Sequence, residues 1–149
     1  MTSKSVVDDF VSQKTLAVVG VSRGGQKFGN MAYRELKAGG RRLYPIHPTA
    51  EKLEGDRAYP DFKPLPEKVG GALIVVPPAQ TEKVVRAAAE AGIPRVWMQQ
   101  GSESAAAVKF CQENGIAEVH GECILMYAGQ AGFHKFHRWV WKLFGKAPK

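Results

Sequence analysis

Residues 15–38 read TLAVVGVSRGGQKFGNMAYRELKA, and they show the unit from which the chain is built. Residues 15–20 are apolar almost throughout and end in a glycine, which is typical of a buried strand. A glycine-rich loop follows, and a helix is predicted from about Phe28 to Ala38, ended by Gly39 and Gly40. The stretch therefore predicts a strand, a loop and a helix in succession.

The same alternation continues to residue 120. Further strands are predicted at residues 42–46, 73–76, 95–99 and 116–120, and Thr81 and Ser102 are predicted to cap the helices between them. The proline-rich residues 51–68 predict one short edge strand plus loops. Apolar strands that alternate with helices indicate a parallel sheet covered on both faces. We therefore predict a single doubly wound α/β domain with three α/β/α layers and the strand order 3-2-1-4-5, with room for a sixth strand.

Composition limits the classes of protein that the chain can represent. Its 149 residues suit one domain over residues 1–149, and 44% hydrophobic and 23% charged residues argue against a disordered or fibrous protein. Two cysteines, Cys111 and Cys123, are too few for a disulfide framework, and no signal peptide opens the chain. The longest apolar runs are too short to cross a bilayer. We expect a cytoplasmic protein without a transmembrane segment.

The formal net charge of +7 favours an anionic partner, and phosphates are the obvious class. Most of the basic residues are scattered over the predicted helices, whereas a nucleic-acid site needs them on one face near stacking aromatic residues. We therefore expect a small phosphorylated ligand and no nucleic acid.

Ligands of open α/β sheets bind beyond the carboxyl ends of the strands. In this chain the rule selects residues 20–30, 47–55, 77–80, 99–102 and 120–123. In the first segment, backbone N–H groups and a helix N-terminus can hold a phosphate or diphosphate, and Ser22, Arg23 and Lys27 add donors and charge. Ser22 replaces the second glycine of the G-x-G-x-x-G pattern. The alternative is a turn that only connects the strand to the helix.

The second strand indicates which nucleotide the site would take. An NAD site usually has Asp or Glu at the end of this strand, to accept a hydrogen bond from the ribose 2′-hydroxyl. Here no carboxylate occurs until Glu51, and the segment instead holds Arg41, Arg42 and His47. This pattern disfavours NAD and suits a phosphorylated ribose, as in NADP or coenzyme A. The alternative is that Arg41 and Arg42 only begin the strand at its far end.

Several motifs, taken in order, resemble those of a known family. They are Ala17-Val-Val-Gly-Val-Ser22 with Lys27-Phe28-Gly29-Asn30, then Tyr44-Pro45-Ile46-His47-Pro48, Val76-Pro77-Pro78, Trp97-Met98-Gln99-Gln100-Gly101, and Cys123 near the last strand. Over about residues 14–126 the chain resembles the small stand-alone CoA-binding domain family. That family is similar to the N-terminal nucleotide-binding domain of the succinyl-CoA synthetase α subunit. The resemblance implies a Rossmann-like domain that binds CoA without the ligase chemistry.

The resemblance also implies roles for individual residues. Gly20, Ser22, Lys27 and Gly29 would contact the phosphates, Pro45, His47, Pro48, Val76, Pro77 and Pro78 would flank the nucleotide, and Gln99 and Gly101 would line the path of the pantetheine arm. Arg23, Phe28 and Asn30 belong to the same phosphate loop, and we include them in the predicted site. The chain departs from the family at His47, where Asn is usual, and at Gly25, where Pro is frequent.

Candidate catalytic groups are few. His120, Glu122 and Cys123 follow the last strand, but residues so close in sequence rarely point into one triad, so we predict no catalytic residue. Cys123 is instead predicted to line the cleft near the CoA thiol, where it could form a mixed disulfide. Tyr33 and Lys37 have the Tyr-x-x-x-Lys spacing of an NADP-dependent oxidoreductase, yet they lie on the first helix of the unit. Non-catalytic binding of CoA or acyl-CoA, as a carrier, sensor or regulatory module, is the prediction; the oxidoreductase is one alternative.

The last segment predicts a basic, aromatic helix over about residues 129–144. Phe133, Phe136, Val140 and Phe144 form an apolar stripe on it. The stripe would dock on its own domain, form a homodimer interface or bind an anionic membrane surface, and a protein-interaction module working through this helix is the second alternative function. His134 and His137 have a spacing that can share a metal, but no nearby ligand completes a set, so no metal site is predicted.

Overall fold

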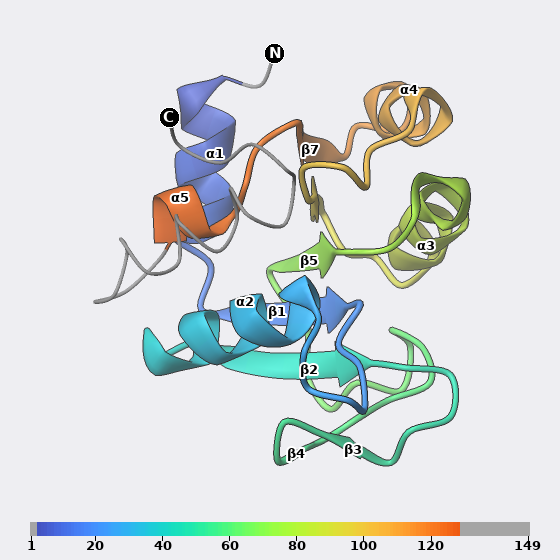
Figure 1. Cartoon of the computed structure of the whole chain (residues 1–149). Coiled ribbons are helices and arrows are strands. Elements are labelled where there is room, and N and C mark those ends of the chain that lie inside the picture. Colours follow the sequence, from blue (N-terminus) through green and yellow to red (C-terminus); the bar gives the residue numbers. More distant parts are fainter. Residues whose placement is uncertain (1–2, 129–149) are drawn as a thin grey trace.

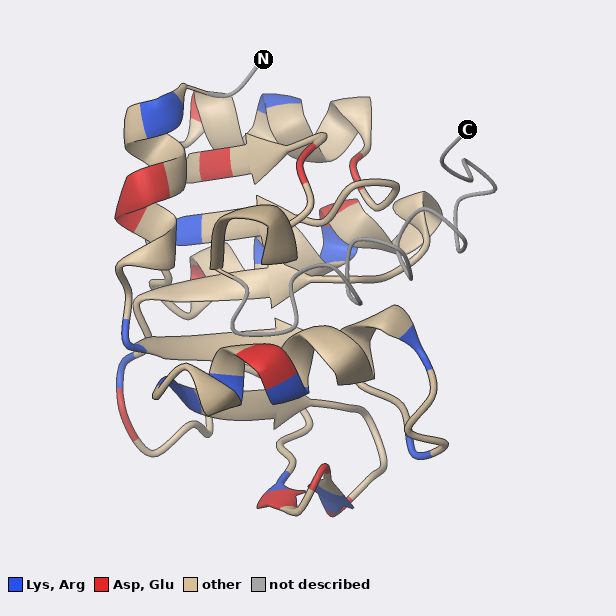
Figure 2. Cartoon of the chain, turned by 60° about the vertical axis from the view of Figure 1, so that its left-hand side comes forward, with Lys and Arg blue, Asp and Glu red and all other residues tan. Residues whose placement is uncertain are grey.

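The computed structural model describes residues 3–128, which form a parallel sheet with helices on both faces (Figure 1). The strands are β1 (Thr15–Val19), β2 (Arg42–Ile46), β5 (Gly71–Ile74), β6 (Arg95–Met98) and β7 (Ala117–His120). They are ordered β2-β1-β5-β6-β7, every neighbouring pair is parallel, and all point toward the same edge (Figure 2). The predicted doubly wound fold is confirmed. The predicted order 3-2-1-4-5 is wrong, because β2 is the edge strand of this sheet and β5 pairs directly with β1.

Helices cover each face of the sheet and enclose two apolar clusters. On one face lie α1 (Lys4–Val11), α2 (Phe28–Ala38) and α5 (Leu125–Ala128), and on the other lie α3 (Pro78–Glu90) and α4 (Ala105–Glu113) (Figure 1). Alternate residues of β1 serve the two clusters, since Leu16 and Val18 face the first and Ala17 faces the second. Because both of their faces are buried, the central strands β1 and β5 are almost wholly apolar, whereas the edge strand β7 also carries Glu118 and His120.

The helices on the second face begin at other residues than predicted. Pro77 is the N-cap of α3 and Pro78 is its first residue, a position that proline fits because its missing N–H would have no partner in the helix. The N-cap of α4 is Ser104, whose Oγ accepts from the Ala107 N–H at 3.1 Å. The predicted caps are therefore wrong. Thr81 instead donates its hydroxyl to the Ser102 carbonyl, and the Ser102 hydroxyl accepts from the Val76 N–H at 3.2 Å. These two hydrogen bonds connect the segment after β5 with the loop after β6.

Residues 51–68 contain a small hairpin in place of the predicted edge strand. Its strands are β3 (Lys52–Leu53) and β4 (Asp56–Arg57), joined by Glu54 and Gly55, which both have positive φ angles of 52° and 82°. A two-residue turn with two positive φ angles is the usual type I′ connection, and glycine favours it. Only one parallel bridge, between Ile46 and Tyr59, attaches the segment to the main sheet. The prolines prevent more pairing because they lack an N–H donor.

The hairpin is also tied to α2 by the Asp56 carboxylate. Its Oδ2 accepts from the Tyr33 hydroxyl and from Lys37 Nζ, the latter at 2.9 Å. Burial alone would raise the pKa of Asp56, but the hydrogen bonds from Tyr33 and Lys37 outweigh burial and lower it. Tyr33 is itself fully buried. The Tyr-x-x-x-Lys pair is thus explained by packing of the hairpin.

Two further predictions concern features beyond the sheet. No helix within residues 3–128 is long and apolar enough to cross a membrane, and the same range contains no group of three or more potential metal ligands. The helix predicted over residues 129–144, with His134 and His137, lies outside the described residues.

Candidate functional site

A cavity of about 430 Å³ lies at the carboxyl ends of β1, β5 and β6. Its volume is in the range of sites that bind small molecules. The loops after these strands and the first turn of α2 form its walls, which consist of Gly20, Gln26, Lys27, Phe28, Gly29, Val75, Val76, Pro77, Gln99, Gln100, Gly101 and Ser102. This is the edge that the topology of an open α/β sheet assigns to ligands.

Two glycines allow close packing where β1 ends, Gly20 against the residue after β5 and Gly29 against Gly20. Gly20 has a φ angle of +116°, and a Cβ atom there would overlap the Val75 carbonyl and lie 2.9 Å from Val75 Cβ. A Cβ atom on Gly29 would lie 2.7 Å from the Gly20 carbonyl carbon. The start of the helix therefore packs directly on the end of the strand, and the backbone of both elements borders the cavity.

Asn30 fixes the shape of the loop between these glycines. Its Oδ1 accepts from the Ser22 N–H at 3.0 Å and from the Ser22 hydroxyl at 2.8 Å, and its Nδ2 donates to the Ser22 carbonyl at 2.9 Å. Asn30 is fully buried. Ser22 and Asn30 therefore hydrogen-bond to each other, and these bonds hold the loop in its shape.

The β3–β4 turn supports the loop from outside. Glu54 accepts through Oε2 from Asn30 Nδ2 at 2.8 Å and through Oε1 from Arg34 Nε at 3.0 Å. Arg34 also donates to the Gly25 carbonyl, so the loop, the helix and the hairpin are joined in one network. Glu54 was not predicted from the sequence. The one signal in the sequence is Gly55, because glycine favours the positive φ angle of the turn at which this segment reverses direction.

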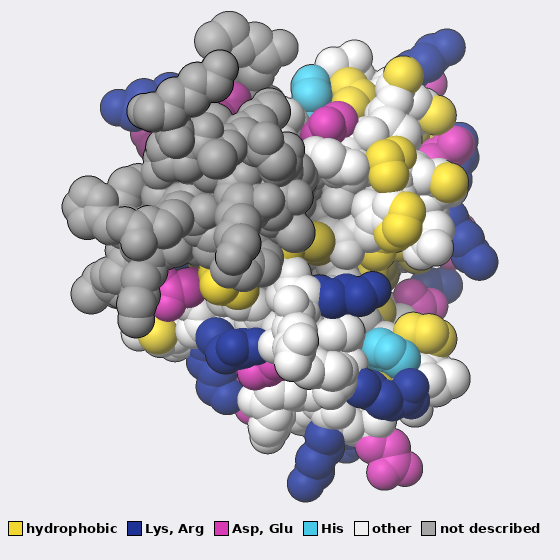
Figure 3. All heavy atoms as spheres, in the orientation of Figure 1, with side chains coloured by type: hydrophobic (Ala, Val, Ile, Leu, Met, Phe, Trp, Pro, Cys, Tyr) yellow, Lys and Arg dark blue, Asp and Glu magenta, His cyan; other side chains and the backbone are white. Residues whose placement is uncertain are grey.

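A basic corner lies beside the cavity, beyond the ends of β1 and β2. Arg23 Nη2 donates to Thr49 Oγ1 at 2.7 Å, and His47 Nδ1 accepts from the N–H groups of Thr49 and Ala50 at 3.1 and 3.0 Å. Figure 3 shows a histidine and basic side chains gathered on this part of the surface. Arg42 lies at the opposite edge of the sheet, where it pairs with Glu67 at 3.2 Å. The positive charge of this corner therefore comes from Arg23, whereas His47 accepts hydrogen bonds through Nδ1.

His47 predicts a dependence of stability on pH. Burial and the nearby Arg23 charge lower the pKa of His47, and its acceptor role at Nδ1 requires the neutral ring. The unfolded chain then binds the proton more readily, so the stability present above pH ~6.5 is lost as the pH falls below that value. Asn can accept from the N–H two residues ahead, so His47→Asn should keep the turn and lose less stability between pH 7.5 and 5.5. Melting temperatures at both pH values measure this, and equal losses would contradict it.

Gln99 carries a buried amide at the far side of the cavity. It is 2% exposed, and its Oε1 accepts from the Ile124 N–H at 3.0 Å. Its Nε2 has no hydrogen-bond partner of normal geometry. An unpaired buried donor is costly unless a ligand or water satisfies it. The amide nitrogen is closed off from solvent and lies beside Cys123, behind the wall to which Gln99 contributes.

Cys123 lies next to Gln99 but belongs to the first apolar cluster and does not line the cavity. Burial raises the pKa of its thiol, although the Gln99 amide and the backbone N–H groups of Leu125 and Met126 favour the thiolate. Its side chain is 5% exposed. Cys123 therefore does not occupy the predicted position in the cleft. Its thiol is packed behind the cavity wall and is largely protonated.

A family model for the CoA binding domain matches residues 14–128 of the chain. The chain belongs to this family. The resemblance on which the sequence prediction rested is therefore confirmed, and the matched region contains the whole sheet and every residue of the cavity wall.

Curated relatives of this CoA-binding domain are archaeal ligases. The α subunit of an ADP-forming acetate–CoA ligase II from Pyrococcus furiosus is 30% identical over 92 residues, which are 61% of this chain and 20% of the relative. An ADP-forming acetate–CoA ligase II from Archaeoglobus fulgidus is 33% identical over 87 residues, which are 57% of this chain and 13% of the relative. The chain therefore spans a fifth or less of these relatives' length.

Solved structures share the fold of this CoA-binding domain. A hypothetical protein from Pyrococcus horikoshii OT3 has a TM-score of 0.78 at 26% identity, with coverage of 85% of this chain and 89% of that one. A conserved hypothetical protein from Pyrococcus furiosus has a TM-score of 0.72 at 32% identity, with coverage of 76% and 97%. The dinucleotide-forming acetyl-coenzyme A synthetase 1 of Ca. Korarchaeum cryptofilum, in complex with phosphate and ADP, has a TM-score of 0.63 at 28% identity, with coverage of 70% and 25%.

The cavity of this CoA-binding domain brings together part of the predicted site. Gly20, Lys27, Phe28, Gly29, Val76, Pro77, Gln99 and Gly101 line it, whereas Ser22, Arg23, Asn30, Pro45, His47, Pro48, Pro78 and Cys123 do not. Gln26, Val75, Gln100 and Ser102 also line the cavity and were not among the predicted site residues. They lie within or beside the segments at the carboxyl ends of the strands. The topology of the sheet therefore predicts them, whereas their residue types do not.

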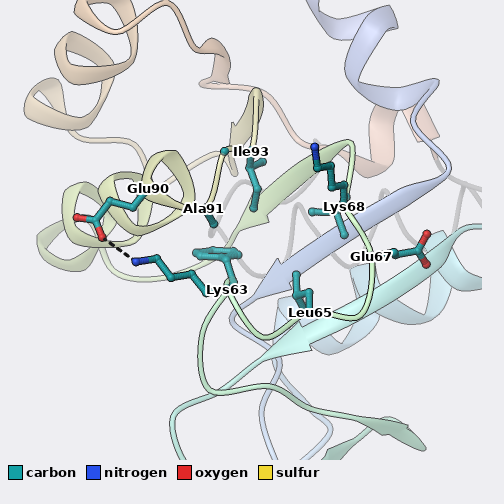
Figure 4. A pocket seen from close by; sticks show the side chains of 10 residues that line it. Lys63, Leu65, Glu67, Lys68, Glu90, Ala91 and Ile93 are labelled. Atoms are coloured by element: carbon teal, nitrogen blue, oxygen red, sulfur yellow. Dashed lines mark ion pairs between the residues drawn. The ribbon is translucent and has the colours of Figure 1, made fainter.

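A second cavity, of about 520 Å³, lies at the amino ends of the strands, between the loop before β5 and the end of α3. Figure 4 shows Lys63 reaching across to Glu90, with which it pairs at 3.8 Å, while Leu65 and Ile93 contribute apolar surface. Its rim holds Glu67 and Glu90 as well as Lys63 and Lys68. Unlike the first cavity, it combines charges of both signs and adjoins the C-terminal end of a helix, which disfavours anions.

Proposed function

We propose that the chain binds coenzyme A or an acyl-CoA at the carboxyl edge of its sheet. The direct contact of Gly20 with Gly29 carries the proposal, because it lets the backbone of the loop and the first turn of α2 approach a diphosphate without side chains between. Lys27, at the N-cap of α2 and in the cavity wall, adds a positive charge at the positive end of the helix dipole.

The other parts of the ligand would follow the order of the strands. The adenosine and its ribose phosphate would lie toward Arg23 and His47, flanked by the prolines after β2 and β5. The pantetheine arm would then pass the loop after β6. There Gln99, Gln100 and Gly101 would line its path.

A binding role without catalysis is favoured by the chemistry of the cavity wall. Among the described residues that form it, Lys27 alone has a side chain that titrates. Tyr33 is buried against the β3–β4 hairpin, and Cys123 is packed behind the wall. These positions support a carrier, sensor or regulatory module over an NADP-dependent oxidoreductase, which would need a proton donor beside the nicotinamide.

Calorimetric titration of the full chain with CoA, NADP and NAD, together with native mass spectrometry of the purified protein, tests the proposal. We expect CoA to bind more tightly than either dinucleotide, and a retained ligand to have the mass of CoA or an acyl-CoA. Tighter binding of NADP would favour the oxidoreductase. Absence of binding by all three would favour a protein-interaction module.

Replacement of Lys27 by alanine should weaken CoA binding. A hydrogen bond between an ammonium and a phosphate contributes about 1.5–3 kcal/mol, so we expect the dissociation constant to rise about 10- to 100-fold. Lys83→Ala, on the exposed surface of α3 and outside the cavity wall, removes the same charge and should change the affinity little. Titration calorimetry measures both variants. An unchanged affinity in Lys27→Ala would mean that Arg23 or another cation holds the phosphate.

A further inference from the structure

Charges of opposite sign lie at the two ends of the carboxyl edge. Figure 2 shows basic residues on the loop after β1 and acidic residues on the loops after the upper strands of the sheet. The basic residues are Arg23 and Lys27, and the acidic ones are Glu103 and Glu122. A ligand that lies along this edge therefore meets positive charge at one end and negative charge at the other.

Glu103 is held against the wall of the cavity by two loops. Both of its carboxylate oxygens accept from the Gly101 N–H at 3.2 Å, and Oε2 also accepts from the Gly121 N–H at 3.2 Å. Gly101 is a wall residue, and the two loops are joined further by the Gln100 N–H, which donates to the Glu122 carbonyl at 3.1 Å. The negative charge of Glu103 thus has a fixed position beside the end of the cavity that lies away from Lys27.

No cation compensates this charge within the described wall. Lys27 is the one charged side chain among those wall residues, and it lies at the first turn of α2, where the diphosphate would bind. If the diphosphate is held there, the arm carries the acyl group toward the loop after β6. An acyl group with its own carboxylate would then approach Glu103 without a counter-charge.

We propose that Glu103 makes the site selective for CoA thioesters with uncharged acyl groups over those of dicarboxylic acids. The inference rests on the proposed binding of CoA and on the direction in which its arm runs. Two carboxylates a few ångströms apart near a protein surface repel each other, and the repulsion corresponds to a roughly tenfold loss of affinity. Glu103 is accordingly a specificity-determining residue.

Butyryl-CoA and succinyl-CoA form a matched pair of probes, because their acyl chains have the same number of carbons and differ in a terminal methyl or carboxylate. We expect butyryl-CoA to bind the full chain about tenfold more tightly in calorimetric titrations. Glu103→Gln removes the charge but keeps an oxygen that can accept from Gly101 or Gly121, and it should reduce the ratio to within about threefold. Glu113→Gln, on α4 and paired with Lys109, is the charge-matched control and should leave the ratio unchanged.

The outcomes separate this inference from the proposed function. If CoA and butyryl-CoA bind but succinyl-CoA binds equally well, or if the preference persists in Glu103→Gln, the role of Glu103 is wrong and CoA binding stands. If none of the CoA compounds binds, both proposals are overturned. Should Glu103→Gln fail to fold, the salt dependence of the unmodified protein decides: an electrostatic preference must shrink in high salt, and a constant ratio would contradict it.

Discussion

Replacement of Gly20 by alanine should abolish CoA binding and destabilise the fold. The backbone there has a φ angle of +116°, which an L side chain rarely adopts, and a Cβ atom would overlap the Val75 carbonyl. Strain and overpacking each cost about 1–3 kcal/mol, so the free energy of unfolding should fall by about 3–5 kcal/mol. The melting temperature should then fall by roughly 10–20 °C, and CoA affinity should fall at least about 100-fold, because the displaced loop no longer meets the diphosphate.

Gly24→Ala is the matched control within the same loop. Its Cβ atom would have no neighbour within 4 Å, and its φ angle is not positive, so we expect the melting temperature and CoA affinity of the unmodified protein. Differential scanning calorimetry and CoA titration at a temperature where both variants are folded compare the two. Normal stability and affinity in Gly20→Ala would show that the contact between the strand and the loop is not essential.

Replacement of Asn30 should have the second largest effect. Its side chain, which is fully buried, holds Ser22 through three hydrogen bonds and donates a fourth to Glu54. Asn30→Ala leaves these partners unpaired, so the free energy of unfolding should fall by about 2–4 kcal/mol. CoA affinity should fall about tenfold or more, because the loop is no longer held in the shape that receives a phosphate.

Asn30→Asp separates hydrogen bonding from lost volume. The carboxylate has the size of the amide, but it cannot donate to the Ser22 carbonyl and would lie against the Glu54 carboxylate. We therefore expect it to destabilise the protein about as much as alanine does. Asn114→Ala is the control, since its Nδ2 donates only to the Phe110 carbonyl at an exposed helix end. Chemical denaturation measures all three variants, and a stable Asn30→Asp would contradict the assigned network.

The sequence predicted the sheet well because its signals are local and repeated. The central strands β1 and β5 are apolar on both faces, and α2 was predicted with the bounds Phe28–Ala38 that the structure shows. The strand starting at Gly71 was predicted two residues late, because two glycines precede its apolar residues. The structure shows why a glycine is needed, since a Cβ atom on Gly71 would lie 2.6 Å from the Phe10 ring. Packing against α1, which is far away in the sequence, therefore requires a glycine at position 71.

The details of the site were harder to predict, because their causes are tertiary. Asn30 was taken as a ligand contact, but its partner Glu54 is 24 residues away in a hairpin that the pattern did not reveal. Thr81 and Ser102 are of residue types that often cap helices. Here the Thr81 hydroxyl donates to the Ser102 carbonyl, and the Ser102 hydroxyl accepts from the Val76 N–H. Cys123 follows the last strand as predicted, yet the chain turns so that its thiol enters the core. Residue type identified the polar groups, and the fold determined their partners.

A crystal structure of the full chain with CoA is the most direct test of the central claim. We predict the diphosphate at the first turn of α2, within hydrogen-bond distance of the loop N–H groups and Lys27, with the arm passing Gln99 and Gly101. CoA bound instead in the cavity between Phe62 and Ile93, at the amino ends of the strands, would contradict the assignment of the site.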